Sequence, residues 1–494
     1  MNQSKRKKVI VIGAGISGLS AACYAAKAGH EVHMLEKNGS PGGRARQFKT
    51  EEGFTFDMGP SWYWMPDIIE NFFQDFGFRS ADFYTLDPLN PQFEFISKDK
   101  RVSIPKDAKE IRALFESEEP GAGKKYDDFM RAAKFKYEVG MQQFIDKPCH
   151  SILEFTKPSL LSSALKLHLF RNFRSYVGSY FKSPLLRSIM EFPVIFLGAS
   201  PAKIPAMYSL MNYGGYELGT WYPQGGFFEL IKAMVKIAED LGVKIHYHAA
   251  VKDLKLVADQ SKNVRIASFK IQNETHTADE IIASCDYQHM ESLLPEKFRN
   301  YSSSYWEKKT FAPSSLIVYL GIKGKIPSMK HHTLFFDAGL DEHLDEIYKE
   351  KSWPKNPLFY VCCPSKTDPH VAPSGAENLF LLMPLATGLE DTEEAREKYL
   401  DIMLSRIQKH FECPDIKERI LYKRSYCVAD FKKDYQAYGG NAYGLANTLS
   451  QTAILKPSIR NKKIKNLHYT GQLTVPGPGV PPSLISGKIV ANEI

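Results

Sequence analysis

Residues 8–26 read KVIVIGAGISGLSAACYAA, and this stretch decides the fold. A β-branched run, Val9–Ile12, is followed by glycines in the pattern G-x-G-x-x-G. Small and apolar residues then recur at helical spacing up to Gly29, and the alternating stretch HEVHMLE ends in the acid Glu36. Strand, tight turn, helix, strand and acid in this order are typical of a dinucleotide-binding βαβ unit. We therefore expect a nucleotide site at the front of an α/β domain.

Two other interpretations of this stretch have to be weighed. Lys5–Lys8 precede the apolar run, as in a secretion signal, and Ser20–Cys23 resembles a lipoprotein cleavage site. A membrane span would need about 20 apolar residues, and this run is barely long enough and contains three glycines. The glycine spacing and the strand that follows favour the nucleotide site over both.

Each residue of the motif has a mechanical task. Gly13 allows the tight turn, Gly15 lets the backbone approach a pyrophosphate, and Gly18 lets helix and strand pack closely. The helix N-terminus offers free N–H groups to the phosphates, and Glu36 would accept hydrogen bonds from the ribose hydroxyls. The contacts predicted in this unit are Gly13, Ala14, Gly15, Ser17, Gly18, Glu36 and Lys37.

The next two motifs indicate which nucleotide binds. Residues 37–46 read KNGSPGGRAR and residues 53–61 read GFTFDMGPS, where a simple NAD domain would continue into a helix. With these motifs the chain resembles the FAD-dependent amine oxidase and carotene desaturase superfamily. The resemblance implies FAD as cofactor and an α/β fold (α+β overall) with a Rossmann-like FAD-binding domain. It also implies FAD contacts at Gly43 and Arg44, at Gly59, Pro60 and Ser61 along the isoalloxazine, and at the backbone of Val251 near the adenine.

Further matches run along almost the whole chain, in residues 198–210, 221–230, 366–373 and 439–457 and in the tail. Together they are similar to bacterial carotenoid desaturases of the phytoene desaturase type. By this likeness Gly471, Gln472 and a helix beginning near Pro482-Ser483 would face the flavin, where the helix dipole stabilises negative charge. The tail sequence GPGVPPS is closer to desaturases that act late in the pathway, at the 3,4 bond of a hydroxylated or monocyclic carotene.

The alternation of α/β and helical stretches predicts a discontinuous arrangement. Residues 1–70, 220–300 and 455–494 would form the FAD-binding domain. Residues 71–219 and 301–454 would form an inserted mixed substrate domain with a helical, membrane-facing part. Expected elements include helical stretches over 67–216 and strands at 243–251, 278–286, 316–322 and 378–386.

No His, Ser or Cys constellation for catalysis is evident, which suits a reaction whose chemistry the cofactor carries. A hydride would leave an allylic carbon for the flavin, and a base would take a neighbouring proton. Glu217 and Tyr222 are candidates for that base or a polar contact, and the catalytic residue stays unassigned. Trp62, Tyr63 and Trp64 are candidates for the lining of an apolar substrate tunnel.

Charge, cysteine content and one basic apolar stretch indicate which partners and which cellular location to expect. The net charge of +8 is a mild basic bias, and seven cysteines without a C-x-x-C predict neither a disulfide framework nor a metal site. Basic and apolar residues alternate over 160–183, as in a helix that lies on a membrane or one that packs on the core. We expect a carotenoid substrate, quinone or oxygen as electron acceptor, no nucleic acid, and a cytoplasmic protein held peripherally at the inner membrane.

Other functions remain open at this stage. Within the flavoenzymes the alternatives are a phytoene desaturase, a carotene isomerase, a saturase, or an amine or porphyrinogen oxidase. A different class is the flavin-free escort protein, which uses a similar fold to carry a lipid. The intact phosphate-binding glycines, residues 42–44 and the tail argue against that last function.

Overall fold

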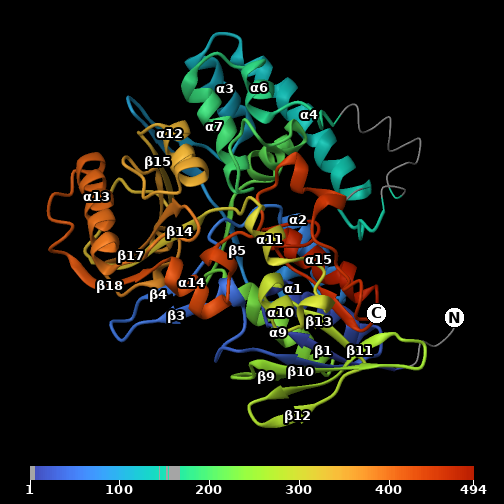
Figure 1. The fold of residues 1–494 in the computed structure, drawn as a ribbon. Helices are drawn as coiled ribbons and strands as arrows, with labels where there is room; N and C mark the ends of the chain where they lie inside the picture. The colour runs from blue at the N-terminus through green and yellow to red at the C-terminus, as the bar shows by residue number, and fades with distance from the viewer. Residues whose placement is uncertain (1–5, 144, 152–153, 155–166) are drawn as a thin grey trace.

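The computed structural model describes residues 6–143, 145–151, 154 and 167–494. At its base lies a five-stranded parallel sheet in the order β19-β13-β1-β2-β9 (Figure 1). Its strands are β1 (Lys8–Ile12), β2 (Glu31–Leu35), β9 (Lys244–His246), β13 (Glu280–Ala283) and β19 (Leu467–Tyr469). Three distant segments therefore build one sheet, which confirms the predicted discontinuous Rossmann-like fold.

The helices beside this sheet pack against one another, two of them at very short distance. They are α1 (Ile16–Lys27), α2 (Pro66–Asp75), α9 (Phe228–Asp240) and α15 (Val480–Ala491). A Cβ atom placed on Gly487 of α15 would lie 2.6 Å from Ser20 Cβ and 2.7 Å from the Ala21 nitrogen of α1. The backbones of α1 and α15 are therefore in direct contact, so the tail is locked against the N-terminal motif.

A second, mixed sheet of seven strands has the order β18-β14-β17-β16-β15-β6-β7. Its strands are β6 (Phe93–Ser97), β7 (Arg101–Ile104), β14 (Ser314–Lys323), β15 (His332–Phe336), β16 (Phe359–Cys362), β17 (Ala376–Leu385) and β18 (Ile420–Tyr426). Helix α13 (Glu393–Phe411) buries its apolar side chains against this sheet. The sheet and α13 lie on the left of Figure 1, and α3 (Ala108–Glu118), α4 (Ala122–Gln143), α6 (Phe173–Gly178) and α7 (Pro184–Ile195) lie at the top.

Smaller elements complete the fold. The strands are β3 (Gln47–Lys49), β4 (Thr55–Asp57), β5 (Leu86–Pro88), β8 (Trp221–Pro223), β10 (Val251–Ala258), β11 (Val264–Ile271) and β12 (Glu274–His276). The helices are α8 (Leu210–Asn212), α10 (Tyr287–Ser292), α11 (Ser303–Glu307), α12 (Leu340–Asp345) and α14 (Val428–Tyr435). Among the described residues, no helix has the length and apolar character that crossing a bilayer requires.

Three local predictions differ from the structure. The stretch 67–216 also contains β5, β6 and β7, because the hairpin of β6 and β7 extends a sheet whose other strands lie far along the chain. The strand expected at 243–251 is divided between β9 and β10, which belong to different sheets. Of the amphipathic helix expected at 160–183, residues 160–166 lie outside the described residues, and α6 is the helical part of the rest.

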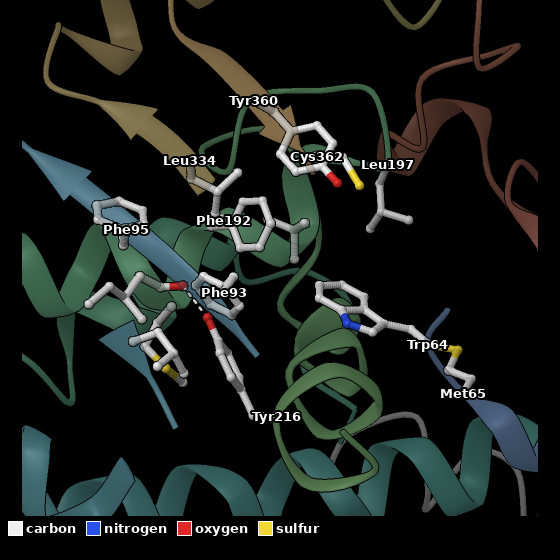
Figure 2. Packing of buried hydrophobic residues seen from close by; sticks show 14 of the residues in the cluster. Trp64, Met65, Phe93, Phe95, Phe192, Leu197, Tyr216, Leu334, Tyr360 and Cys362 are labelled. Atoms are coloured by element: carbon white, nitrogen blue, oxygen red, sulfur yellow. Dashed lines mark hydrogen bonds between the residues drawn. The ribbon is translucent and has the colours of Figure 1, made fainter. Parts of the chain in front are cut away.

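An aromatic core joins the second sheet to the upper helices. Figure 2 shows Phe93 of β6, Phe192 of α7 and Tyr216 packed together, with the Tyr216 hydroxyl donating to the Ile189 carbonyl at 2.6 Å. The ring centroids of Phe93 lie 5.3 Å from Phe192 and 5.8 Å from Tyr216. Phe192 of this core also lines the large cavity of the protein.

Candidate active site

A single cavity of about 1510 Å³ extends from the carboxyl ends of the parallel strands to the space beneath the upper helices. In open α/β sheets, ligands bind at this edge of the strands. At one end it is lined by the N-terminal glycine loop and the tail, and at the other by apolar side chains. The cavity thus has a polar half and an apolar half.

The glycine loop forms one wall of the polar half. Gly13 has φ of 103°, a left-handed conformation that favours glycine, and its N–H donates to the Leu35 carbonyl at 2.8 Å. A Cβ on Gly18 would collide with the Gly13 carbonyl oxygen and lie 2.9 Å from Ser284 Oγ. A Cβ on Gly15 would meet nothing within 4 Å, so this position is open to the cavity.

Glu36 is held beside this loop at the end of β2. Its Oε2 accepts from the Ala14 N–H at 2.8 Å, and its Oε1 accepts from the Asn38 N–H at 2.8 Å. The side chain is buried and lines the cavity. Lys37 also lines the cavity, but its ammonium donates to the Lys433 carbonyl, and burial lowers its pKa.

Arg44 supplies a partly buried cation on the loop that lies beside the glycine loop. One terminal nitrogen donates to the Asn441 carbonyl at 3.2 Å, and the guanidinium lies 4.9 Å from the Tyr435 ring centroid. Its Nε is buried and has no hydrogen-bond partner among the described residues, and burial lowers its pKa. A cation with a buried, unpaired N–H donor suits an anionic group in the cavity, so the residues present fit a pyrophosphate-bearing cofactor.

The tail closes the polar half. The Gly471 N–H donates to Ser486 Oγ at 3.0 Å, and Gln472 Nε2 donates to Asn441 Oδ1 at 3.1 Å. Helix α15 begins at Val480 with prolines in its first turn, and Pro482 and Ser483 line the cavity. Its N-terminus therefore faces the cavity, where the helix dipole favours negative charge.

Most of the residues predicted from the sequence meet at this cavity. Two do not line it: Ala14, which donates to Glu36, and Gly18, which packs against Gly13. The residues that do line it are Gly13, Gly15, Ser17, Glu36, Lys37, Gly43, Arg44, Gly59, Pro60, Ser61, Val251, Gly471, Gln472, Pro482 and Ser483. Their individual contacts with FAD stay predictions.

The candidates for the catalytic base lie elsewhere. Glu217 is exposed and does not line the cavity, although partial desolvation raises the pKa of its carboxyl. Tyr222 borders a separate cavity of about 20 Å³. Trp62 and Trp64 line the large cavity, whereas the Tyr63 side chain enters the core, where its hydroxyl lies 2.8 Å from the Tyr84 hydroxyl.

Sequence reasoning missed several lining residues. Ser284, Cys285 and Asp286 directly follow β13 and line the cavity beside Gly13. Their position after a buried parallel strand was a usable signal, because such strand ends form the ligand-binding edge. Tyr360, which comes from the second sheet, gave no signal because nothing in the sequence pairs β15 and β16 with the N-terminal loop.

The apolar half opens at a mouth with exposed apolar side chains. Phe170 is 91% exposed and Leu455 is 50% exposed, and Leu449 and Ile454 are exposed as well. All four line the cavity. Inside it, Phe192, Leu334, Phe336 and Leu382 present hydrocarbon surfaces. This half can bury a long apolar molecule.

Comparisons with known proteins agree with this site. The chain is 38% identical to the carotenoid 3,4-desaturase of Haloarcula japonica, over 100% of this chain and 99% of that protein. It is 29% identical to a 4,4'-diapophytoene desaturase of Staphylococcus haemolyticus, over 98% of each chain. It is 28% identical to the zeta-carotene-forming phytoene desaturase of Myxococcus xanthus, over 99% of this chain and 94% of that protein.

Solved structures show the same fold at low sequence identity. An oxidoreductase from Methanosarcina mazei superposes with a TM-score of 0.60 at 17% identity, over 98% of this chain and 100% of that chain. Cyclohexylamine oxidase from Brevibacterium oxydans superposes with a TM-score of 0.59 at 15% identity, over 99% of this chain and 98% of that chain.

The family assignment rests on nearly the whole chain. Residues 16–494 match the family of flavin containing amine oxidoreductases; this range includes the cavity-lining residues from Ser17 to Ser483 and begins after Gly13 and Gly15. The relative at 38% identity covers the whole of this chain. The protein is an FAD-dependent oxidoreductase, and the chain belongs to the flavin containing amine oxidoreductase family.

Proposed function

We propose that this chain is a carotenoid desaturase that introduces a C=C bond late in the pathway, at the 3,4 bond of a hydroxylated or monocyclic carotene. The observation that carries the proposal is the continuity of the cofactor half of the cavity with a long apolar half. The relatives that are named carotenoid and diapophytoene desaturases support it.

FAD would be held by three separated segments, as the predicted domain division requires. The N-terminal loop and Arg44 would bind the pyrophosphate, Glu36 the ribose, the backbone of Val251 the adenine, and the start of α15 the pyrimidine edge of the flavin. When bound, FAD supplies the hydride-accepting chemistry. The N-terminal dipole of α15 would stabilise the negative charge that develops there.

The apolar half would bind the substrate by burial, because a carotenoid has no polar group at the reacting bond. About 25 cal/mol is gained per Å² of apolar surface removed from water, so a long polyene needs few specific contacts. Trp62 and Trp64 lie between the two halves and would orient the polyene against the flavin. The same walls exclude water from the reacting carbon.

We further propose that the mouth of the cavity rests on the cytoplasmic face of the inner membrane. Four apolar side chains are exposed beside the opening: Phe170, Leu449, Ile454 and Leu455. Arg171 follows Phe170 directly in the chain. Apolar side chains with a neighbouring cation suit the boundary of a phospholipid layer. A lipid-soluble substrate could then pass from the bilayer into the cavity without crossing water, and quinone or oxygen would reoxidise the enzyme.

Incubation of the purified, FAD-loaded protein with phytoene, lycopene and 1-hydroxy-γ-carotene tests the reaction. We expect conversion of the hydroxylated carotene, seen as a red-shifted absorption and a product two mass units lighter. Conversion of phytoene alone would contradict the late position. A colourless protein that carries lipid but no flavin would contradict the enzyme assignment.

Vesicle flotation tests the membrane contact. Phe170→Asp and Leu455→Asp should each weaken binding to phospholipid vesicles about tenfold or more, because each removes an apolar side chain from the contact. Val257→Asp is the matched control, since Val257 is 52% exposed but lies on β10, away from the cavity. Equal loss of binding in all three variants, or in none, would contradict this orientation.

A further inference from the structure

A buried tyrosine–histidine pair lies where the polar half of the cavity meets the apolar half. Tyr360 is the second residue of β16, and His332 is the first residue of the adjacent strand β15. Figure 2 shows Tyr360 close to Cys362 and Leu334 within the apolar core. The pair matters because the structure does not bring Glu217 or Tyr222 to the cavity.

The Tyr360 hydroxyl connects the cavity with the protein interior. Tyr360 lines the cavity, and its Oη lies 3.0 Å from Ser61 Oγ and 2.6 Å from His332 Nδ1. Ser61 is one of the residues predicted to lie along the isoalloxazine. The phenol is therefore beside the predicted position of the reacting bond, with a basic nitrogen directly behind it.

His332 is held in place by packing and is neutral before the proton transfer. Its ring stacks on Trp62 with centroids 4.1 Å apart and an interplanar angle of 14°. Complete burial and the neighbouring His331 hold its pKa well below the ordinary value. Its Nε2 is buried and has no hydrogen-bond partner among the described residues. Its other ring nitrogen, Nδ1, contacts the Tyr360 hydroxyl.

We propose that Tyr360 takes the proton that the substrate loses and passes its own phenolic proton to His332. This inference rests on the proposed desaturase function. After hydride loss, the C–H bond next to the cationic carbon breaks and its electron pair becomes the new C=C bond. The proton bonds to Tyr360 Oη while the Oη–H proton moves to His332 Nδ1. Atoms and charge balance with one imidazolium formed.

The chemistry of both partners suits this transfer. The neutral tautomer with its proton on Nε2 leaves Nδ1 free to accept, and the 2.6 Å separation suits a direct proton transfer. An allylic cation makes the neighbouring C–H bond strongly acidic, so a weakly basic imidazole suffices. Tyr360 touches the substrate and is the catalytic residue, whereas His332 acts through it.

A small second cavity borders Ser61, which contacts Tyr360, and His331, which packs against His332. It has a volume of about 20 Å³, enough for one water molecule, and is lined by Ser61, Asp57, Tyr222, His331 and Cys362. The ring centroids of His331 and His332 lie 4.5 Å apart. Burial raises the pKa of Asp57 to about 6, so a proton acceptor with an accessible pKa borders the same space.

Two substitutions separate proton transfer from packing. Tyr360→Phe keeps the ring and removes the hydroxyl, and His332→Asn keeps an acceptor near Nδ1 but removes its basicity. General acid–base groups contribute about 100- to 10,000-fold, so both variants should form product at least ~100-fold more slowly in a single turnover. Tyr399→Phe is the matched control because Tyr399 is also a buried tyrosine whose hydroxyl donates a hydrogen bond, to the Pro354 carbonyl at 2.8 Å, but it does not line the cavity. Its rate should stay near that of the wild type.

Two further measurements exclude a structural effect. The FAD content and the unfolding temperature of both variants should equal those of the wild type. The wild-type single turnover should be slower in D₂O, because the phenolic and imidazole protons exchange with solvent, and Tyr360→Phe should abolish this difference. A desaturating wild type without a solvent isotope effect, or a His332→Asn variant within twofold of its rate, would overturn the relay. A wild type that desaturates no carotenoid would instead refute the proposed function.

Discussion

At the scale of single residues, the three glycines of the first loop have separable tasks. A Cβ atom on Gly18 would collide with the Gly13 carbonyl and with Ser284. A Cβ atom on Gly15 would point into open space in the cavity. A methyl group on Gly18 would therefore disturb the protein itself. A methyl group on Gly15 would disturb what binds there.

This difference gives the first prediction. Gly15→Ala should keep the unfolding temperature of the apoprotein but lower its FAD affinity at least ~10-fold, because the new Cβ occupies the path of the pyrophosphate. Gly18→Ala should lower both. Thermal unfolding of the apoproteins and flavin titration measure the two effects, and equal losses of stability in the two variants would contradict this account.

Lys136 gives a prediction about pH. Its Nζ is buried, donates to Ser209 Oγ at 2.9 Å, and lies 3.9 Å from the Tyr176 ring centroid. Burial, with a contribution from Arg171, lowers its pKa from 10.5 to about 7. Between these two pKa values the unfolded chain holds a proton that the folded protein lacks. The free energy of unfolding therefore rises with pH across this range, by up to about 1.4 kcal/mol per pH unit. This stability is fully present above pH 10.5 and is lost as the pH falls through about 7.

Lys136→Met removes this dependence. The variant should exceed the wild type in free energy of unfolding most strongly below neutral pH, and its advantage should shrink as the pH rises toward 10.5. Urea denaturation of both proteins across this range measures the difference. An advantage that grows with pH would have the wrong sign.

At the scale of elements, the packing of α15 on α1 fixes the tail against the glycine loop. Gly487→Ala would drive a Cβ into Ser20 and Ala21 and should destabilise the protein by about 1–3 kcal/mol, with partial loss of FAD. Gly140→Ala in α4 is the control, because its Cβ would meet Leu210 Cδ2 at an ordinary 3.6 Å. That variant should be neutral or gain up to about 1 kcal/mol. Chemical denaturation compares the two, and equal stability would contradict direct backbone contact.

The elements also show which parts of the fold can be predicted from the sequence and which cannot. Residues 9–36 and the tail are predictable because hydrophobic period, glycine positions and proline placement all point to the same structure. The strands β6 and β7 are not, because β6 is stabilised by pairing with β15, more than 200 residues away in the chain, and β7 is stabilised by pairing with β6. Tyr360 and His332 are missed for the same reason, since a site contributed by a distant sheet has no local pattern.

At the scale of the whole molecule, a parallel sheet built from three segments forms one end of a cavity, and a seven-stranded sheet with its helices forms the rest. The resemblance implied the discontinuous FAD domain, and the sheet order agrees with it. The volume of the apolar half depends on packing among distant side chains, so it could not be read from the sequence. The proposed function depends on the place where the cofactor half of the cavity meets its apolar half.

The central claim is that a single bound FAD faces the apolar cavity and oxidises a carotenoid there. Anaerobic mixing of the FAD-loaded protein with 1-hydroxy-γ-carotene in vesicles, followed by absorption spectroscopy, tests it most directly. The account predicts that the oxidised flavin band bleaches in proportion to the new C=C bonds, one flavin reduced for each bond formed. A flavin that stays oxidised while the carotenoid is bound and unchanged would contradict it.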